Sequence, residues 1–359
     1  MIKFFRKIRY NLMSENKTGK YFKYALGEIL LVVIGIMIAL QANNWNEKRK
    51  TNNTIETLID KIEDDVIADV EHVNNEIAFY EERELMMQRI LKKEVTKDDY
   101  RQFKYYEILF NYSDFNPNTE NLDKLLVLEE TVKPEYLPII KAIKSLKGRK
   151  QYKDLAWNDL QKAFTDNVDY YTLSGKDFTF KRDSSSIEKT INFYLTDSNY
   201  LNRVFNYSIK NHNVLFEMRI ARAGLIKILA QIKQEKHQFN KDELVNLLTS
   251  LNLNHYKEVA CRSTAKDYPD LKGTRQRLLI FNTTKDTLSV NVTDKYDTNL
   301  YEFKLKPGAT EAHETWRGGL LNGGDYSKVI SVYRDSICLA KFTEEPHGYL
   351  IIDNTIVND

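Results

Sequence analysis

The pattern of apolar and polar residues changes three times along the chain, and its first part is a continuous apolar run. This run covers Tyr24–Ala42, YALGEILLVVIGIMIALQA, and follows a polar, basic start. In a helix these residues would extend roughly 28 Å, at about 1.5 Å per residue, which is close to the hydrocarbon thickness of a bilayer. The pattern therefore predicts a single transmembrane helix over residues 24–43.

A cleaved signal peptide is the alternative interpretation of this run. The positive region of a signal peptide is normally short, whereas 23 largely polar and basic residues come first here. Leu40-Gln41-Ala42 is also a poor cleavage site, so we expect an uncleaved anchor. The preceding segment, residues 1–23, predicts an amphipathic helix lying in the membrane interface, with a disordered basic tail as the alternative. Its apolar residues at helical spacing are Ile2, Phe5, Ile8 and Leu12.

Residues 53–91 show a helical period and predict one long helix. The step from Val66 to Val70 breaks the heptad phase, and Glu84 interrupts the apolar seam. A self-associating coiled coil and packing against later helices fit this pattern equally well. The seam consists of Ile55, Ile59, Ile62, Val66, Val70, Val73, Ile77, Tyr80, Met87 and Leu91.

The chain continues with mainly helical patterns, which predict a helical domain over residues 44–255. The last long helix could pair antiparallel with the first, and core packing accounts for most of the dense aromatic residues in this part. An aromatic ligand groove is the alternative. The predicted helices are Lys97–Tyr112, Asn121–Glu130, Pro134–Leu146, Tyr152–Tyr171, Ser186–Tyr207, Ile209–His237 and Lys241–Leu251.

The pattern changes again near Lys272, where short alternating runs begin. Leu288, Val290 and Val292 alternate with polar residues, and turn sequences such as Lys306-Pro307-Gly308 separate the runs. We expect a linker over residues 256–271 and an all-β, sandwich-like module of about seven strands over residues 272–359. The further strands expected are Tyr301–Leu305, Val329–Tyr333, Ile337–Phe342 and Tyr349–Ile352.

The charge distribution indicates how the chain is oriented. Residues 1–50 hold 10 Lys and Arg against 3 acids, whereas the remainder has 43 basic and 48 acidic residues. The more cationic flank of a span stays in the cytoplasm, so we expect a bacterial inner-membrane protein with a cytoplasmic N-terminus and a periplasmic body. The mildly acidic body argues against binding to nucleic acid.

Glu28 is a carboxylate within the predicted span, where it must be neutral, paired or able to reach water. It could extend back to the cytoplasmic interface near Lys23. Alternatively it lies on a helix-contact face, because small residues follow it at heptad-like spacing and allow close approach of a second helix. This candidate face consists of Glu28, Gly35, Ala39 and Ala42.

The first fifty residues also carry a resemblance. MIKFFRKIR, the span GEIxLVVIGIxIALQ and the exit NNWNE resemble the N-terminus of a Bacteroidota single-pass membrane family, one of the families of unknown function. The resemblance implies a bacterial envelope protein and carries no activity. The positions that match the family pattern, and are therefore the ones to test, are Glu28, Gln41, Asn44 and Trp45.

The last quarter of the chain carries a second, weaker resemblance. The order LLIFNTTKDTLSVNVTD, LYEFKLKPGA, HETWRG and ISVYRDSICLAKF is similar to the von Hippel-Lindau β-domain family, on generic strand and turn residues. It implies a binding module without catalysis. The two cysteines, Cys261 and Cys338, could form a disulfide in an oxidising compartment, although two buried free thiols are the commoner arrangement.

Motifs for catalysis or metal binding do not stand out. The six histidines form no HExxH, and no phosphate loop or GxSxG is present. Asp294, Asp297 and Glu302 could bind calcium, but a solvated loop accounts for them better. We therefore expect no cofactor, no metal and no catalytic residue. The SxxK tetrads at Ser14, Ser186 and Ser263 are explained by chance.

These observations predict a non-enzymatic envelope protein whose periplasmic body binds partners or acts as a scaffold. Membrane lipid, and self-association or a membrane-protein partner, are the expected contacts. One alternative is a subunit of an energised or signalling membrane complex that uses Glu28, and another is a periplasmic enzyme of unrecognised type.

Overall fold

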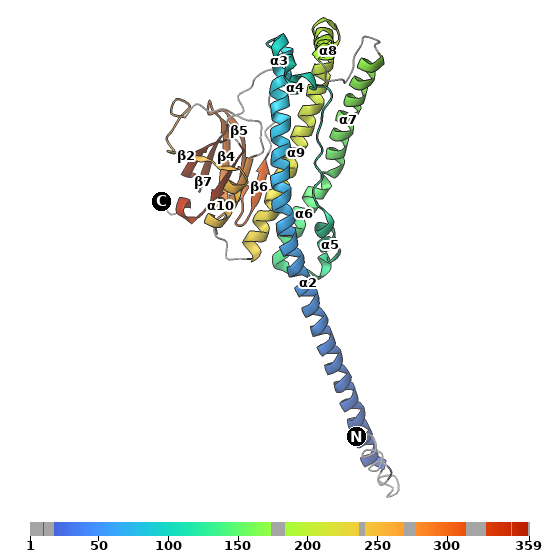
Figure 1. Cartoon of the computed structure of the whole chain (residues 1–359). Helices are drawn as coiled ribbons and strands as arrows, with labels where there is room; N and C mark the ends of the chain where they lie inside the picture. Colours follow the sequence, from blue (N-terminus) through green and yellow to red (C-terminus); the bar gives the residue numbers. More distant parts are fainter. Residues whose placement is uncertain are drawn as a thin grey trace.

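The computed structural model describes residues 10, 18–173, 184–236, 241–268, 278–313, 328–345 and 347–357. The described chain is mostly helical, with an N-terminal long apolar helix and C-terminal strands that form sheets. Figure 1 shows a single helix extending below an elongated body, with helices on one side of this body and strands on the other.

Helix α2 runs without interruption from Thr18 to Leu91. No glycine or proline occurs after Gly35 in this helix, so neither of the two strongest helix breakers interrupts it. Its lower half carries the apolar run. The described part of the chain buries no residue of the most apolar 18-residue window in this run. Its upper half carries the predicted seam, which is buried from Ile55 to Met87. One helix is thus both the uncovered apolar rod and the centre of the body.

Helix α9 (Tyr200–Lys236) packs antiparallel along the upper half of α2. Ion pairs fix the direction, because later residues of α9 meet earlier residues of α2. Lys233 lies 2.6 Å from Glu63, whereas His212 lies 2.8 Å from Glu84. This antiparallel pairing is one of the two arrangements that the sequence pattern left open, and Glu84, which interrupts the apolar seam, has its partner on α9.

Shorter helices complete the helical side of the body. They contact α2 and α9, and the predicted helices over 121–130, 134–146 and 152–171 lie close to the observed ones. Aromatic side chains fill the end farthest from the apolar run, where the Tyr194 and Tyr200 rings stack at 4.8 Å. The helices are α3 (Lys97–Arg101), α4 (Phe103–Tyr106), α5 (Glu120–Val127), α6 (Leu137–Gly148), α7 (Lys150–Leu173), α8 (Ser184–Thr196) and α10 (Lys241–Ser250), with 3-10 turns at Glu129–Thr131 and Pro134–Tyr136.

The predicted helix Lys97–Tyr112 is wrong in its second half. The chain is extended at Gln102 and leaves helical structure after Tyr106. Carbonyl groups beyond this point accept hydrogen bonds from side chains of other helices, which a continuing helix would prevent. The donors are Arg83 to Ile108 O, Tyr207 to Asn111 O at 3.0 Å, and Tyr80 and Trp157 to Ser113 O at 2.5 and 3.2 Å.

The predicted boundary between Tyr207 and Ile209 is also wrong. The chain instead leaves helical structure between Thr196 and Tyr200, and α9 then runs through residues 207–209. The Asp197 carboxylate accepts a hydrogen bond from the Asn199 backbone N–H at 3.0 Å, a local turn that competes with the helix. His237, the predicted end of this helix, lies outside the described residues.

The strands form two sheets. The four-stranded sheet has the order β1-β9-β3-β6 and includes two parallel pairs, and the five-stranded sheet has the order β2-β8-β7-β4-β5 and is antiparallel throughout. The strands are β1 (Asn254–His255), β2 (Lys257–Val259), β3 (Leu278–Asn282), β4 (Leu288–Asp294), β5 (Asn299–Leu305), β6 (Thr310–His313), β7 (Lys328–Arg334), β8 (Ile337–Thr343) and β9 (Gly348–Ile352), followed by helix α11 (Asn354–Val357).

The alternating side chains of β3 and β9 join two cores. Ile280 and Leu350 face the five-stranded sheet, whereas Phe281 and Ile351 belong to the core shared with the helices. The four-stranded sheet is therefore buried on both faces, which explains the continuous burial of β9. The predicted boundaries at 255 and 271 need correction, because β1 and β2 already belong to the sheets.

Candidate functional site

The candidate helix-contact face lies on the uncovered part of α2. Glu28, Gly35, Ala39 and Ala42 fall within about 60° of each other around the axis at 100° per residue. A Cβ added at Gly35 would meet no atom within 4 Å, and Ala39 and Ala42 are exposed. The structure thus brings the four residues to one side of the helix, where Gly35, Ala39 and Ala42 are exposed and Glu28 is partly buried.

Three of the four positions singled out by the first resemblance lie where the apolar run ends. Gln41, Asn44 and Trp45 line a shallow hollow of about 540 Å³ along α2, together with Met37, Leu40 and Lys48. The guanidinium of Arg49 lies 5.5 Å from the centre of the exposed Trp45 ring. An aromatic ring next to cations is typical of a helix that leaves a bilayer.

A charged cluster connects α2, α9 and the β module. Arg219 donates to Glu81 Oε1 at 2.8 Å, and His347 Nε2 lies 3.4 Å from Glu81 Oε2. Arg222 donates to Asn74 Oδ1 at 2.9 Å and to His347 Nδ1 at 3.2 Å. His347 thereby links the turn before β9 to both long helices.

Burial and charge pairing shift the pKa values within this cluster. Burial raises the pKa of Glu81, but the hydrogen bond from His347 and the ion pair with Arg219 outweigh it and lower the pKa to about 2. Burial and the neighbouring Arg219 lower the pKa of Arg222 to about 10. The cluster is a charged contact that holds the module against the helices.

A second buried ion pair lies inside the β module. Lys328 Nζ is 3.2 Å from Glu344 Oε1, and each side chain is only 2% exposed. The Lys328 backbone N–H also donates to Glu344 Oε2 at 3.0 Å. The pair joins the first residue of β7 to the end of β8, and its interior position fits a structural role.

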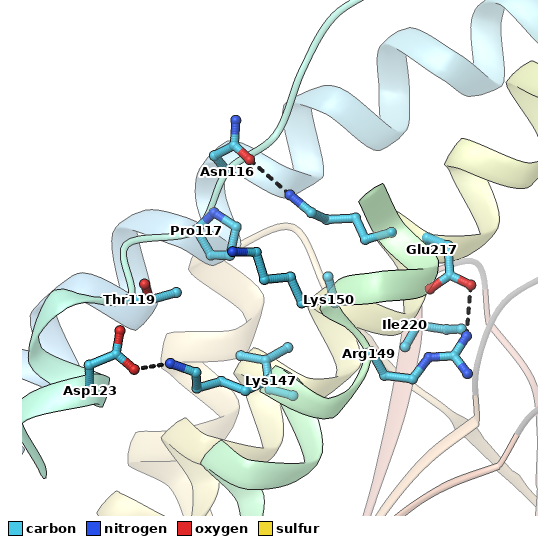
Figure 2. Close-up of a pocket in the computed structure, with 12 residues that line it drawn as sticks. Asn116, Pro117, Thr119, Asp123, Lys147, Arg149, Lys150, Glu217 and Ile220 are labelled. Atoms are coloured by element: carbon cyan, nitrogen blue, oxygen red, sulfur yellow. Dashed lines mark hydrogen bonds and ion pairs between the residues drawn. The ribbon is translucent and has the colours of Figure 1, made fainter. Parts of the chain in front are cut away.

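A pocket of about 310 Å³ lies between α6, α7, α9 and the segment before α5 (Figure 2). Four cations line it, namely Lys147, Arg149, Lys150 and Lys153, together with two acids, Asp123 and Glu217. The remaining lining is Asn116, Pro117, Thr119, Leu146, Ile220 and Ala221. This site was not predicted from the sequence, although the basic run KSLKGRKQYK, residues 144–153, is a signal that could have indicated it.

Two of the four cations are neutralised within the pocket. Lys147 pairs with Asp123, and Arg149 donates to Glu217 Oε1 at 2.7 Å. Lys153 donates instead to neutral oxygens, Phe115 O at 3.0 Å and Asn116 Oδ1 at 2.8 Å. Burial lowers the pKa of the Lys153 ammonium. The pocket can therefore hold negative charge, since its lining carries four positive and two negative groups.

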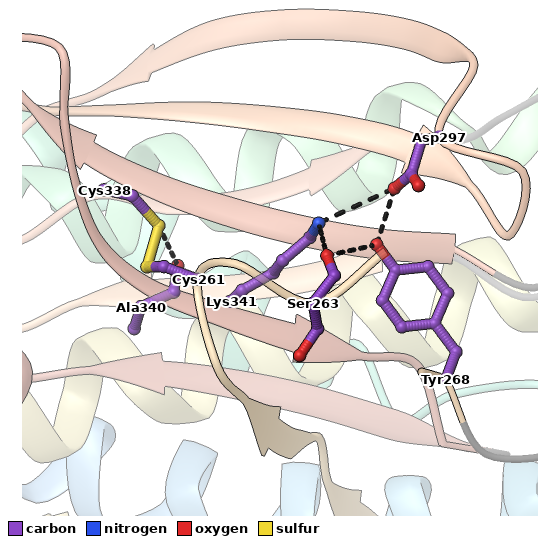
Figure 3. The surroundings of a disulfide bond; sticks show 7 residues. All are labelled: Cys261, Ser263, Tyr268, Asp297, Cys338, Ala340 and Lys341. Atoms are coloured by element: carbon purple, nitrogen blue, oxygen red, sulfur yellow. Dashed lines mark hydrogen bonds and ion pairs between the residues drawn. A yellow bond between two sulfur atoms is a disulfide. The ribbon is translucent and has the colours of Figure 1, made fainter. Parts of the chain in front are cut away.

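Cys261 and Cys338 form a disulfide with a Cα–Cα distance of 6.1 Å. The expectation of two free thiols is wrong, because residues after β2 pass directly beside β8 (Figure 3). Lys341 donates to Ser263 O at 2.7 Å, and the Tyr268 hydroxyl donates to Asp297 Oδ1 at 2.5 Å. The disulfide and these bonds fix the 261–268 segment on the five-stranded sheet.

Calcium binding at Asp294 and Asp297 finds no support in the described residues. The Asp294 carboxylate accepts backbone N–H groups of Tyr296 and Thr298, both at 2.8 Å, within the β4–β5 turn. Asp297 is engaged by Tyr268, Ala265 and Lys341. No group of three or more metal-ligating side chains occurs among the described residues.

The chain was compared with family models, curated proteins and solved structures, and none of these comparisons found a match. The two resemblances stay predictions. The helical body and the two sheets therefore define the class of this molecule by architecture alone, as an elongated α and β body on one long apolar helix.

Proposed function

We propose that this chain is an inner-membrane-anchored envelope protein whose periplasmic body binds partners or acts as a scaffold. The continuity of α2 from Thr18 to Leu91 carries the proposal. Because one helix is both the apolar rod and the centre of the body, the body is held at a fixed height and rotation relative to the span. A flexible linker would not hold it in this way.

The organisation of the body supports a binding role. The two sheets share one core and form a sandwich-like module, which the Glu81 cluster attaches to the helices. The disulfide lies within this module, between the segment after β2 and strand β8. Self-association through a coiled coil would use α2 surfaces outside the buried seam. The disulfide fits an oxidising compartment such as the periplasm.

Topology is the first test. The full chain is fused at its C-terminus to alkaline phosphatase, which is active only outside the cytoplasm, or to a fluorescent protein that matures only inside it. We expect an active phosphatase and a dark fluorescent fusion. The reverse result would overturn the anchored periplasmic arrangement.

The scaffold role is tested by breaking the continuity of α2. A Gly-Gly-Ser-Gly insertion after Lys50 uncouples the body from the span, whereas an insertion after Lys93, where α2 has ended, is the matched control. In-cell cross-linking and pull-down of the tagged full chain should recover partners with the control and lose them with the Lys50 insertion. Equal recovery from both would contradict a role for the rigid connection.

The second candidate is a subunit of an energised or signalling membrane complex. The observation in its favour is that Glu28 shares one side of α2 with the exposed residues Gly35, Ala39 and Ala42. Under this proposal Glu28→Gln removes a multi-pass membrane partner from the pull-down without lowering the protein level. Unchanged recovery would reject it.

A further inference from the structure

The basic pocket between α6, α7 and α9 has more positive than negative charge. Its lining contains four cations and two acids, and the two ion pairs Lys147–Asp123 and Arg149–Glu217 account for half of the cations. Lys150 and Lys153 remain. We propose that this pocket binds a small organic dianion of the phosphomonoester class, held between Lys150 and Lys153.

Lys153 provides the first contact for the anion. Its side chain is only 14% exposed, and its nearest carboxylate, Asp154, is 3.9 Å away and half-exposed. An ammonium group has three N–H donors, and Phe115 O and Asn116 Oδ1 accept two of them. A largely buried cation held by neutral oxygens is costly, and an anion in the pocket would offset this cost.

Lys150 provides the second contact from the first turn of α7. Its side chain is exposed and extends beside Pro117 at the mouth of the pocket (Figure 2). Both Lys150 and Lys153 belong to the first turn of this 24-residue helix, and the N-terminal end of a helix carries partial positive charge. Two cations and a helix N-terminus therefore favour a dianionic group at one place.

The remaining walls indicate an organic ligand. Leu146, Ile220 and Ala221 give the pocket an apolar side opposite the lysines. Its volume of about 310 Å³ is at the lower end of the range for small-molecule sites, roughly 300–1,000 Å³. The phosphate group of a phosphomonoester would contact the lysines, and a short carbon skeleton would contact the apolar side.

A phosphate group could come from a soluble phosphomonoester or from a lipid headgroup. The distance between the pocket and the apolar run distinguishes these two ligands. The segment that lines the pocket is fixed to α2 at Asp69, where the Asn118 backbone N–H donates at 2.9 Å. Asp69 lies about 40 Å along the helix from Ala42, the end of the apolar run. Headgroups of the anchoring bilayer are thus out of reach, and the ligand is soluble.

The test uses the full chain in lipid nanodiscs and titrates glycerol 3-phosphate by calorimetry, with glycerol as the neutral match. We expect saturable binding of the phosphate ester and none of glycerol. Lys150→Gln and Lys153→Gln should each raise Kd about tenfold, because each removes a charge-assisted hydrogen bond. Lys162→Gln is the matched control, since Lys162 is exposed on α7 outside the pocket, and it should change Kd less than twofold.

The outcomes decide the proposal independently of the membrane topology. Absence of saturable binding, or an equal loss in Lys162→Gln, overturns it. Nanodiscs containing phosphatidate should leave Kd unchanged, and competition by them would assign the site to lipid instead. Circular dichroism melting checks that each variant folds. Lys150→Gln alone keeps the test valid if Lys153→Gln does not fold, because Lys150 is exposed.

Discussion

Arg219 of α9 donates a hydrogen bond to Glu81 of α2 at 2.8 Å, in the part of the body where the β module also contacts the helices. The second oxygen of the same carboxylate faces His347, in the turn before β9. The Glu81 carboxylate on α2 thus contacts both α9 and the β module, and α2 itself continues into the apolar run. Removal of this carboxylate should therefore affect the whole body.

Glu81→Gln should lower the free energy of unfolding by about 2 kcal/mol at pH 7, because it leaves Arg219 and Arg222 buried without their carboxylate. The pKa of Glu81 is lowered to about 2, so its stabilisation is present above pH 4.5 and is lost as the pH falls towards 2. Urea unfolding of the full chain between pH 7 and pH 3 measures both effects. Glu71→Gln, at an exposed position of α2, is the control and should have little effect.

Asp69→Asn should stabilise the protein at neutral pH. Burial raises the pKa of Asp69 to about 6, although the hydrogen bond from the Asn118 backbone N–H opposes this, so the folded state holds an extra proton between pH 4 and 6. The stability from the protonated form is present below pH 3.8 and is lost as the pH rises through 6. We expect a gain of about 1–2 kcal/mol at pH 7 that fades below pH 5.

Unfolding curves at several pH values measure this gain. The exposed Asp64→Asn serves as the comparison and should show no such pH dependence. A loss of stability in Asp69→Asn at pH 7 would contradict the raised pKa.

Gly348→Ala should destabilise the protein by about 3 kcal/mol or more. A methyl group at this position would overlap the Tyr256 ring and lie 2.6 Å from the Glu345 carbonyl oxygen. The Tyr256 side chain is buried between the two sheets and cannot move away without disturbing the core. Thermal unfolding measures the loss. Gly148→Ala is the control, since a Cβ there meets nothing within 4 Å and alanine favours the helix.

Reduction of the Cys261–Cys338 disulfide should cost about 3–4 kcal/mol of stability. The bond joins residues 77 apart in the sequence, and a cross-link over a loop of this length removes much entropy from the unfolded chain. Denaturant midpoints with and without reductant measure the loss. The double variant Cys261→Ser with Cys338→Ser should not respond to reductant, and an equal response would assign the effect to another cause.

The periodicity of apolar residues was sufficient to predict much of the fold. The seam from Ile55 to Met87 and the alternation at Leu288, Val290 and Val292 identify the upper half of α2 and strand β4, because burial on one face imposes the period of each element. The chain breaks at Gln102 and Asp197 were not predictable in this way. Tertiary hydrogen bonds to the carbonyl groups of residues 108–113 end the first helix, and a local carboxylate turn ends the second.

The apolar run, the long helical seam and most strands could be read from local sequence, because they depend on neighbouring residues and on the solvent that each side chain prefers. Which distant side chains meet depends on how the helices and sheets pack together. The disulfide and the contact of His347 with Glu81 join residues that lie far apart in the chain, and the pocket brings the basic run around Lys150 and Lys153 next to Asn116 and Glu217. The packing of separate elements creates such sites, and the local periodicity of the sequence carries no information about how the elements pack.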